Sequence, residues 1–130
     1  MTMWTIPLPY EAPPLSLNQR MHWAKKSKIT KQVRMIARAG ARHIPDLPAC
    51  EVELVWFVKD RRRRDIDNPV LTLKALCDGL VDAEVVPDDT PEYMHKRPVQ
   101  IIYRPGQDAA LELRVYDTAA SNRDGEQENR

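Results

Sequence analysis

The chain lacks the cysteine and hydrophobic patterns of a disulfide scaffold, a zinc ribbon or a membrane protein. Its two cysteines, Cys50 and Cys77, show neither Cys-x-x-C spacing nor histidines at metal-ligand spacing, so we expect free, buried thiols in a reducing compartment. The longest apolar stretch, residues 52–58, is interrupted by Glu53 and is far shorter than the roughly 18 residues of a membrane span. Residues 1–14 contain no basic segment followed by an apolar one, so we expect no secretory signal.

Acidic residues are absent from residues 12–45, although the whole chain has a formal net charge of only +1. The basic residues of this segment are Arg20, Lys25, Lys26, Lys28, Lys31, Arg34, Arg38 and Arg42. A second basic block is the run Arg61, Arg62, Arg63 and Arg64, and the sign of the charge reverses directly after it. Separated charges in a nearly neutral chain favour a polyanionic partner and a distinct acidic site. The simpler alternative is a soluble domain with an uneven surface.

The length of 130 residues and an apolar content of 42% predict one domain with one core. Hydrophobic periodicity predicts strands at residues 3–8, 51–59, 94–104 and 110–116, and helices at residues 22–42 and 68–82. The order β-α-β-α-β-β predicts a small α/β (α+β) domain over residues 1–117, with a mixed four-stranded sheet and both helices on one face. Pro98 suggests an edge strand or a bulge. The polar residues 118–130 are expected to form a disordered tail.

The first predicted helix separates apolar from basic residues. Its apolar side is expected to pack on the sheet, which leaves the basic side to solvent; an ordinary solvated face is the alternative. That alternative is weakened by the absence of interspersed glutamates, which would support the helix through i,i+4 pairs. Asn68 is predicted to cap the second helix, with Pro69 at its first position. Trp23 and Trp56 are predicted to belong to the core rather than to stack on nucleobases.

Three acidic positions predict a metal-dependent phosphate site. In an extended segment Asp65 and Asp67 would point to one side, about 6.6 Å apart. Mg²⁺ commonly binds one or two carboxylates together with phosphate oxygens. The site would be complete if the chain returned to Asp65 and Asp67 at Asp88 and Asp89. Lys74, on the second predicted helix, could stabilise the negative charge that develops in the transition state.

Each of these features also has a simpler explanation. An isolated Asp-x-Asp pattern is common, and residues 88–91 are typical of a turn. Lys74 and Asp78 are four residues apart, so they can pair on the surface of a helix. His22 is predicted to be a surface or capping residue rather than a ligand.

Several sequence blocks together resemble the RusA family of Holliday junction resolvases. They are Arg62-Arg63-Arg64-Asp65-Ile66-Asp67-Asn68, Lys74 with Cys77-Asp78-Gly79-Leu80, and Val86-Pro87-Asp88-Asp89. Residues 13–24, nearer the N-terminus, form a further block that resembles the family. The resemblance implies a homodimer that binds four-way DNA junctions and nicks them in pairs with Mg²⁺, or Mn²⁺ as a substitute, in the cytoplasm of a bacterium or of the host of a phage.

The resemblance also implies roles for individual residues. The acidic triad of the family would fall on Asp65, Asp67 and Asp89, with Asp88 as a neighbouring carboxylate and metal ligand. The catalytic lysine would fall on Lys74, although the interval of nine residues from Asp65 is longer than in the best-known members. The predicted DNA contacts are Arg20, Lys25, Lys26, Lys28, Lys31, Arg34, Arg38, Arg61, Arg62, Arg63, Arg64 and Asn68.

Three functions remain open from the sequence. The first is a Mg²⁺-dependent, structure-selective endodeoxyribonuclease that acts in recombination or repair. The second is a non-catalytic module that binds branched DNA. A small phosphoester hydrolase is the weakest of the three, because the basic residues spread over a long helix and a separate loop.

Overall fold

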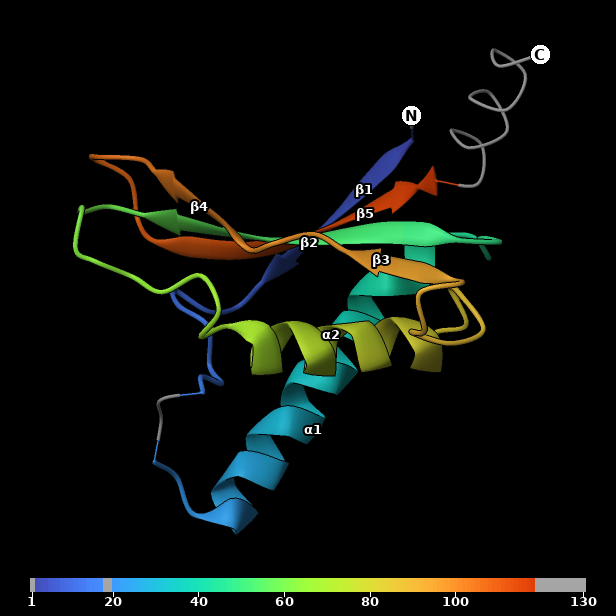
Figure 1. The fold of residues 1–130 in the computed structure, drawn as a ribbon, viewed down its shortest axis with the longest axis horizontal. Coiled ribbons are helices and arrows are strands. Elements are labelled where there is room, and N and C mark those ends of the chain that lie inside the picture. Colours follow the sequence, from blue (N-terminus) through green and yellow to red (C-terminus); the bar gives the residue numbers. More distant parts are fainter. Residues whose placement is uncertain (1, 18–19, 119–130) are drawn as a thin grey trace.

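A computed structural model describes residues 2–17 and 20–118, which form an α+β domain with two helices on one face of a mixed sheet (Figure 1). The elements are β1 (Met3–Leu8), α1 (Trp23–Gly40), a 3₁₀ turn (Ala41–His43), β2 (Cys50–Val58), α2 (Val70–Asp82), β3 (Met94–Lys96), β4 (Gln100–Tyr103) and β5 (Ala110–Asp117). The predicted fold class is therefore confirmed. Apart from Thr118, the predicted disordered tail lies outside the described residues.

The sheet has the order β1-β5-β2-β3, and β4 also pairs with β2. Strands β1 and β2 run antiparallel to β5 on either side of it, whereas β3 and β4 run parallel to β2. Period-two alternation places Leu111, Leu113 and Val115 in the core, as the sequence predicts. Both cysteines are buried and free, and burial raises the pKa of each thiol to about 12, so neither is a reactive thiolate.

The predicted four-stranded sheet is wrong in one respect, because the sheet has five strands. The expected strand at residues 94–104 is divided into β3 and β4, which both pair with β2 along the same edge. The division falls at Pro98, which has no N–H to donate to a sheet. Just before it, the Arg97 N–H donates to the Val52 carbonyl at 2.9 Å. The edge position suggested by Pro98 is confirmed.

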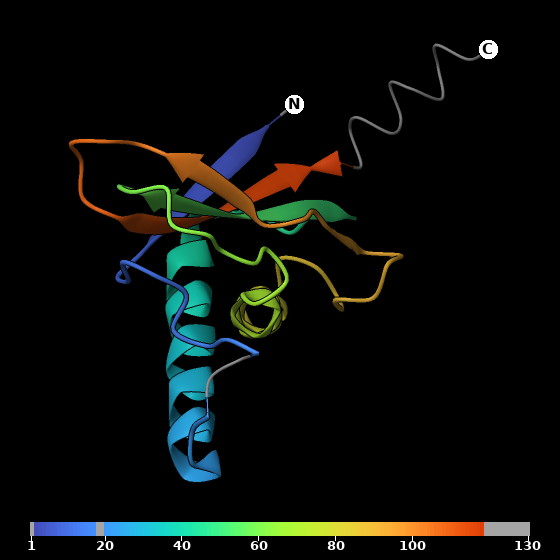
Figure 2. The same cartoon turned by 60° about the vertical axis from the view of Figure 1, so that its left-hand side comes forward.

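Helix α1 does not lie along the sheet as expected but packs mainly on α2 (Figures 1 and 2). Gly79 of α2 makes the close approach possible, because a Cβ there would lie 2.6 Å from the Ala37 Cβ and closer still to the Arg34 carbonyl oxygen. The Arg34 guanidinium also binds both carboxylate oxygens of Asp82 on α2. Arg34 is therefore a link between the helices rather than a free cation.

The N-terminal end of α1 projects away from the sheet (Figure 2). All residues from 22 to 28 are exposed, and Trp23 is 76% exposed. The predicted core position of Trp23 is therefore wrong, because this end of the helix has nothing packed around it among the described residues. Trp56, in contrast, is partly buried against the core.

The two helix starts differ from each other. His22 caps α1, since its Nδ1 accepts a hydrogen bond from the Ala24 N–H at 3.2 Å, which confirms the capping interpretation. Asn68 does not cap α2, which begins at Val70 after a turn.

Within the described part of the chain, no helix has both the length and the apolar character needed to cross a bilayer.

Candidate functional site

The arginine loop, residues 60–68, connects β2 to α2 and is organised by Asp60. The Asp60 carboxylate accepts hydrogen bonds from the Arg62 N–H at 3.1 Å and from Arg64 Nη2 at 2.7 Å. These bonds, the backbone one first, lower the pKa of Asp60 to about 2. The carboxylate therefore stays charged at neutral pH and holds the loop in one conformation.

The four arginines of this loop have different roles. Arg64 has a side chain only 12% exposed, donates to the carbonyls of Asp60 and Arg62, and lies 5.2 Å from the centre of the Trp56 ring. Arg64 therefore shapes the loop, and its role in binding DNA stays a prediction. Arg61, Arg62 and Arg63 are exposed, and Arg61 lies over the Tyr103 ring. Arg61 and Arg63 form no ion pair with a described residue, whereas Arg62 Nε lies 3.3 Å from Asp60 Oδ1, and all three side chains are open to a phosphate backbone.

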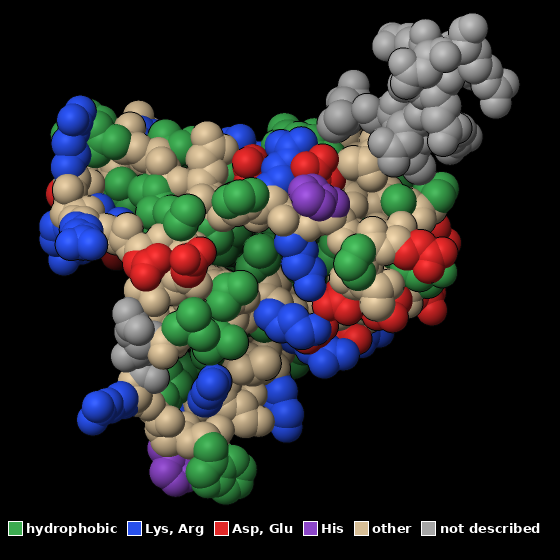
Figure 3. Space-filling model, in the orientation of Figure 1, with side chains coloured by type: hydrophobic (Ala, Val, Ile, Leu, Met, Phe, Trp, Pro, Cys, Tyr) green, Lys and Arg blue, Asp and Glu red, His purple; other side chains and the backbone are tan. Residues whose placement is uncertain are grey.

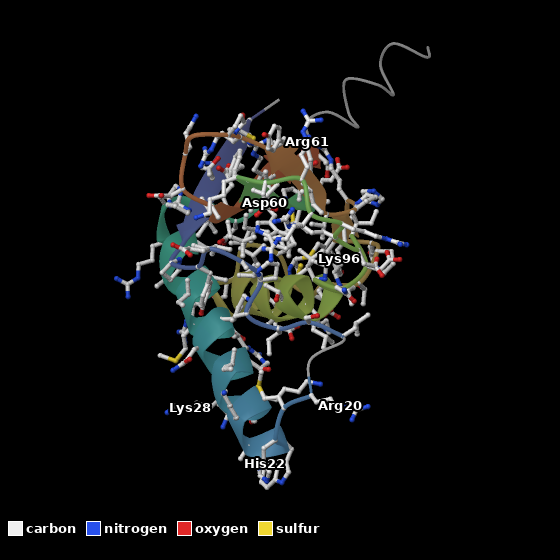
Figure 4. All side chains as sticks on the ribbon, turned by 90° about the vertical axis from the view of Figure 1, so that its left-hand side faces the viewer. Arg20, His22, Lys28, Asp60, Arg61 and Lys96 are labelled. Atoms are coloured by element: carbon white, nitrogen blue, oxygen red, sulfur yellow. The ribbon has the colours of Figure 1, made fainter. Side chains whose placement is uncertain are left out.

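A second basic surface is the free end of α1, defined as residues 20–31 where described. Its cations are all exposed and have no acidic partner among the described residues: Arg20, Lys25, Lys26, Lys28 and Lys31. Arg38 is exposed further along the helix. Figure 4 shows Arg20, His22 and Lys28 at the projecting end, with Asp60 and Arg61 at the sheet. The predicted basic helix thus has a free half and a half that binds α2.

Asp65 and Asp67 lie on the arginine loop just before α2, but not in an extended segment. Asp65 Oδ1 accepts a hydrogen bond from the Asp67 N–H at 2.9 Å, and the Asn68 N–H donates to the Asp65 carbonyl at 3.2 Å. The segment is therefore a turn, so the expected strand geometry of the two acids is wrong. Both side chains are exposed, and neither forms an ion pair with a described residue. Figure 3 shows Asp and Glu atoms over this loop, between groups of Lys and Arg atoms.

Asp89 belongs to a lysine–aspartate cluster of Lys74, Asp78, Asp89 and Lys96. Its carboxylate accepts from Lys74 at 2.8 Å and from Lys96 at 3.2 Å, while Lys74 also contacts Asp78 at 3.1 Å. The two lysines, Lys74 first, lower the pKa of Asp89 to about 2. The aspartates in turn raise the pKa of Lys74, so its ammonium form is favoured. The predicted pairing of Lys74 with Asp78 is confirmed.

Lys96 is the member of this cluster that the sequence analysis missed. It lies in β3, seven residues after Asp89, and its ammonium lies 3.2 Å from the Asp89 carboxylate. No motif in the sequence singled it out. Asp88 accepts a hydrogen bond from the Asp89 N–H at 2.8 Å, which fits the turn interpretation of these residues.

The predicted three-carboxylate metal site is not assembled in this structure. Among residues 2–17 and 20–118, no group of three or more Asp, Glu, His or Cys side chains is placed to hold a metal ion. Asp89 instead forms ion pairs with Lys74 and Lys96, which neutralise its charge. Asp65 and Asp67 remain suitable for Mg²⁺, because they offer exposed carboxylates and Mg²⁺ needs only one or two from a protein when phosphate oxygens and water complete its shell.

The N-terminal loop closes the other side of the arginine loop. The Thr72 hydroxyl accepts from the Leu15 N–H at 3.0 Å and donates to the Leu15 carbonyl at 2.7 Å, and the Leu17 N–H donates to the Asn68 carbonyl at 3.2 Å. A cavity of ≈ 240 Å³ between the two loops is lined in part by Trp56, Arg63, Asp65 and Asn68. Asn68 is thus placed beside the acidic residues.

Comparisons with known proteins leave the family open. No family model matches the chain. The chain is 30% identical over 93 residues to an uncharacterised protein of Xylella fastidiosa (strain Temecula1 / ATCC 700964), a match that covers 66% of this chain and 61% of that protein. The chain thus spans less than two thirds of the length of this relative.

Replacing Asp89 by asparagine should lower the free energy of unfolding by about 1 kcal/mol at pH 7, because it removes a charged acceptor from two lysines. The ordinary pKa of the aspartate is 3.8 and its pKa in the folded chain is about 2. Its contribution is therefore fully present above about pH 4 and is lost as the pH falls toward 2. Urea unfolding of both proteins at pH 7, 4 and 2.5 measures this. Asp88→Asn is the matched control, since Asp88 has no ion pair with a described residue. A pH-independent difference would contradict the prediction.

Proposed function

We propose that this chain is a Mg²⁺-dependent, structure-selective endodeoxyribonuclease of the RusA type, which resolves four-way junctions as a homodimer. The observation that supports this most is the composition of the arginine loop. Three exposed arginines and the partly buried Arg64 precede two exposed aspartates, and these precede the N-terminus of α2. Cations and a helix N-terminus attract a phosphate backbone, and carboxylates beside it suit hydrolysis of a phosphodiester.

In the proposed mechanism Arg61, Arg62 and Arg63 bind the DNA strand through its phosphates, which aligns the strand without reading its sequence. Asp65 and Asp67 would hold Mg²⁺, which when bound supplies an activated water and neutralises charge on the scissile phosphate. The hydrogen bond from the Asp67 N–H to Asp65 fixes the turn that presents both carboxylates. Lys74 carries a positive charge within α2, where it can stabilise a developing negative oxygen.

The proposed homodimer follows from the symmetry of the substrate. A four-way junction has an approximate two-fold axis, and a two-fold dimer presents two identical sites to two strands of like polarity. One chain of this size has a single arginine loop, so paired nicks require two chains. The two basic surfaces of each protomer would bind separate phosphates of the junction.

A second candidate is a non-catalytic module that binds branched DNA. It is favoured by the lysine–aspartate cluster, in which Asp89 is bound to Lys74 and Lys96 and does not join Asp65 and Asp67. Both candidates share the basic surfaces, so binding alone does not separate them.

A labelled four-way junction incubated with the protein in Mg²⁺ and, separately, in EDTA tests the proposal. We expect symmetric nicks in Mg²⁺ and binding without nicks in EDTA, with a linear duplex of equal length bound less tightly. The logarithm of the binding constant should fall with the logarithm of salt concentration by roughly 0.9 per phosphate contact. Binding without products in either Mg²⁺ or Mn²⁺ would favour the non-catalytic module. Failure to bind the junction at low salt would contradict both candidates.

A further inference from the structure

The free end of α1 carries an aromatic side chain that is not part of the hydrophobic core. Trp23 is 76% exposed, whereas the other exposed large hydrophobic side chains that are described range from 43% to 68%. In the part of the chain that the structure describes, its one ring neighbour is His22, at 5.6 Å between centroids. Among the described residues a large indole exposed at the tip of a projecting helix packs against no core residue, so its place is better explained by a partner.

The charges around Trp23 indicate the chemistry of this partner. The neighbouring cations Lys25, Lys26 and Lys28 are exposed, and residues 12–45 contain no acidic side chain. A shallow depression of ≈ 400 Å³ runs along one side of α1 and is lined by Trp23, Lys26, Ser27, Thr30, Lys31 and Arg34. The indole and two lysines that have no acidic partner among the described residues thus share one side of the helix, over about 12 Å from residue 23 to residue 31. An anionic polymer with flat apolar groups complements this surface.

We infer that Trp23 stacks on a nucleobase exposed at the branch point of the DNA substrate, while the lysines of the free end of α1 bind the flanking phosphates. This inference rests on the proposed function for its substrate class. Base–aromatic stacking contributes about 1–3 kcal/mol per base, and the bases inside a linear duplex are already stacked on one another. Trp23 therefore contributes to affinity only where a base face is open, and so it selects branched over linear DNA. A protein partner would require a wider apolar surface than one indole among lysines.

The experiment compares Trp23→Ala, Trp23→Phe and Met35→Ala with the wild-type chain. Met35 is a matched control because it is 68% exposed on the same helix, outside the free end. All four proteins are titrated in EDTA, so that cleavage plays no part, against a junction with 2-aminopurine at the branch point and against a duplex of equal length. Thermal unfolding should be unchanged in every variant, because both side chains are exposed.

We expect Trp23→Ala to lower junction affinity about 5-fold to 100-fold and to change duplex affinity less than about twofold. Trp23→Phe should recover most of the loss, and Met35→Ala should behave as wild type. Binding of the wild-type chain should change the 2-aminopurine fluorescence, and Trp23→Ala should not.

Three results would overturn the inference. One is wild-type junction affinity in Trp23→Ala, and another is an equal loss on junction and duplex. The third is that Trp23→Ala loses the binding to anionic phospholipid vesicles that the wild-type chain shows, while its DNA binding stays intact. This result would assign the indole to a membrane surface. These outcomes leave the nuclease proposal standing, whereas a wild-type chain that binds no junction would overturn both.

Discussion

Asp67→Asn is expected to lower the rate of junction cleavage by about 100-fold to 1,000-fold while junction binding is retained. Asparagine keeps the size of the side chain but removes the charge that would hold a divalent ion. Asp67 is the better choice of the two loop aspartates, since the Asp65 carboxylate also accepts the Asp67 N–H and supports the turn. Binding should become slightly tighter, because one negative charge beside the phosphate backbone is gone.

Single-turnover cleavage in Mg²⁺ and junction binding in EDTA measure the two parts of this prediction. Asp46→Asn removes the same charge from an exposed residue before β2, at the other end of that strand. This control should cleave and bind as wild type. If Asp67→Asn cleaved junctions at the wild-type rate, the loop aspartates would have no role in cleavage. Loss of binding together with cleavage would indicate a role for Asp67 in positioning DNA instead.

Gly79→Ala is expected to lower the free energy of unfolding by about 2 kcal/mol or more. Alanine has the higher helix propensity, by about 1 kcal/mol, so the local effect favours the variant. The added methyl would, however, overlap the Arg34 carbonyl and lie 2.6 Å from the Ala37 Cβ. Overpacking costs about 1–3 kcal/mol and sometimes more, and a backbone oxygen in the middle of α1 cannot move aside as a flexible side chain can.

Urea unfolding followed by far-UV circular dichroism measures this effect. Gly40→Ala is the matched control, because the atom nearest to its added methyl is a side-chain carbon of Ile6 rather than a backbone atom. We expect the smaller loss at Gly40. Equal stability of Gly79→Ala and wild type would show that α1 can shift on α2 at little cost, and the position of the free end of α1 would then be adjustable.

Local patterns in the sequence predicted much of the fold. Alternation in residues 110–116 and in residues 51–59 predicted strands that are present, and Pro98 marked the point where the strand expected at residues 94–104 divides. The failures at Trp23 and Asn68 have a different origin. Periodicity reports which side of a helix is apolar, but not whether anything covers a given turn or which residue accepts the first N–H.

The candidate site, too, combines features that the sequence predicted with features that it did not. A motif placed Asp65, Asp67 and Asp89 among the predicted ligands, yet the carboxylate of Asp89 meets Lys74 and Lys96. These contacts join α2, the turn that follows it and β3, and the motif did not include Lys96. Charge counts likewise treated all arginines alike, whereas Arg34 binds Asp82 and Arg64 supports its own loop.

By itself the sequence determined the order of the elements except for the division of the strand at residues 94–104, the α+β class, the segregation of charge and the pair of aspartates ahead of α2, because each depends on residues close together in the chain. Only the tertiary structure decided which cations are free, which acid is neutralised and that Trp23 stands exposed at the end of a projecting helix. Some of these depend on contacts between residues far apart in the sequence, such as Arg34 with Asp82, and others on how a turn folds, as at Asp89 and Lys96. Such contacts form where packing and charge neutralisation satisfy several elements at once, and this balance is absent from any single segment.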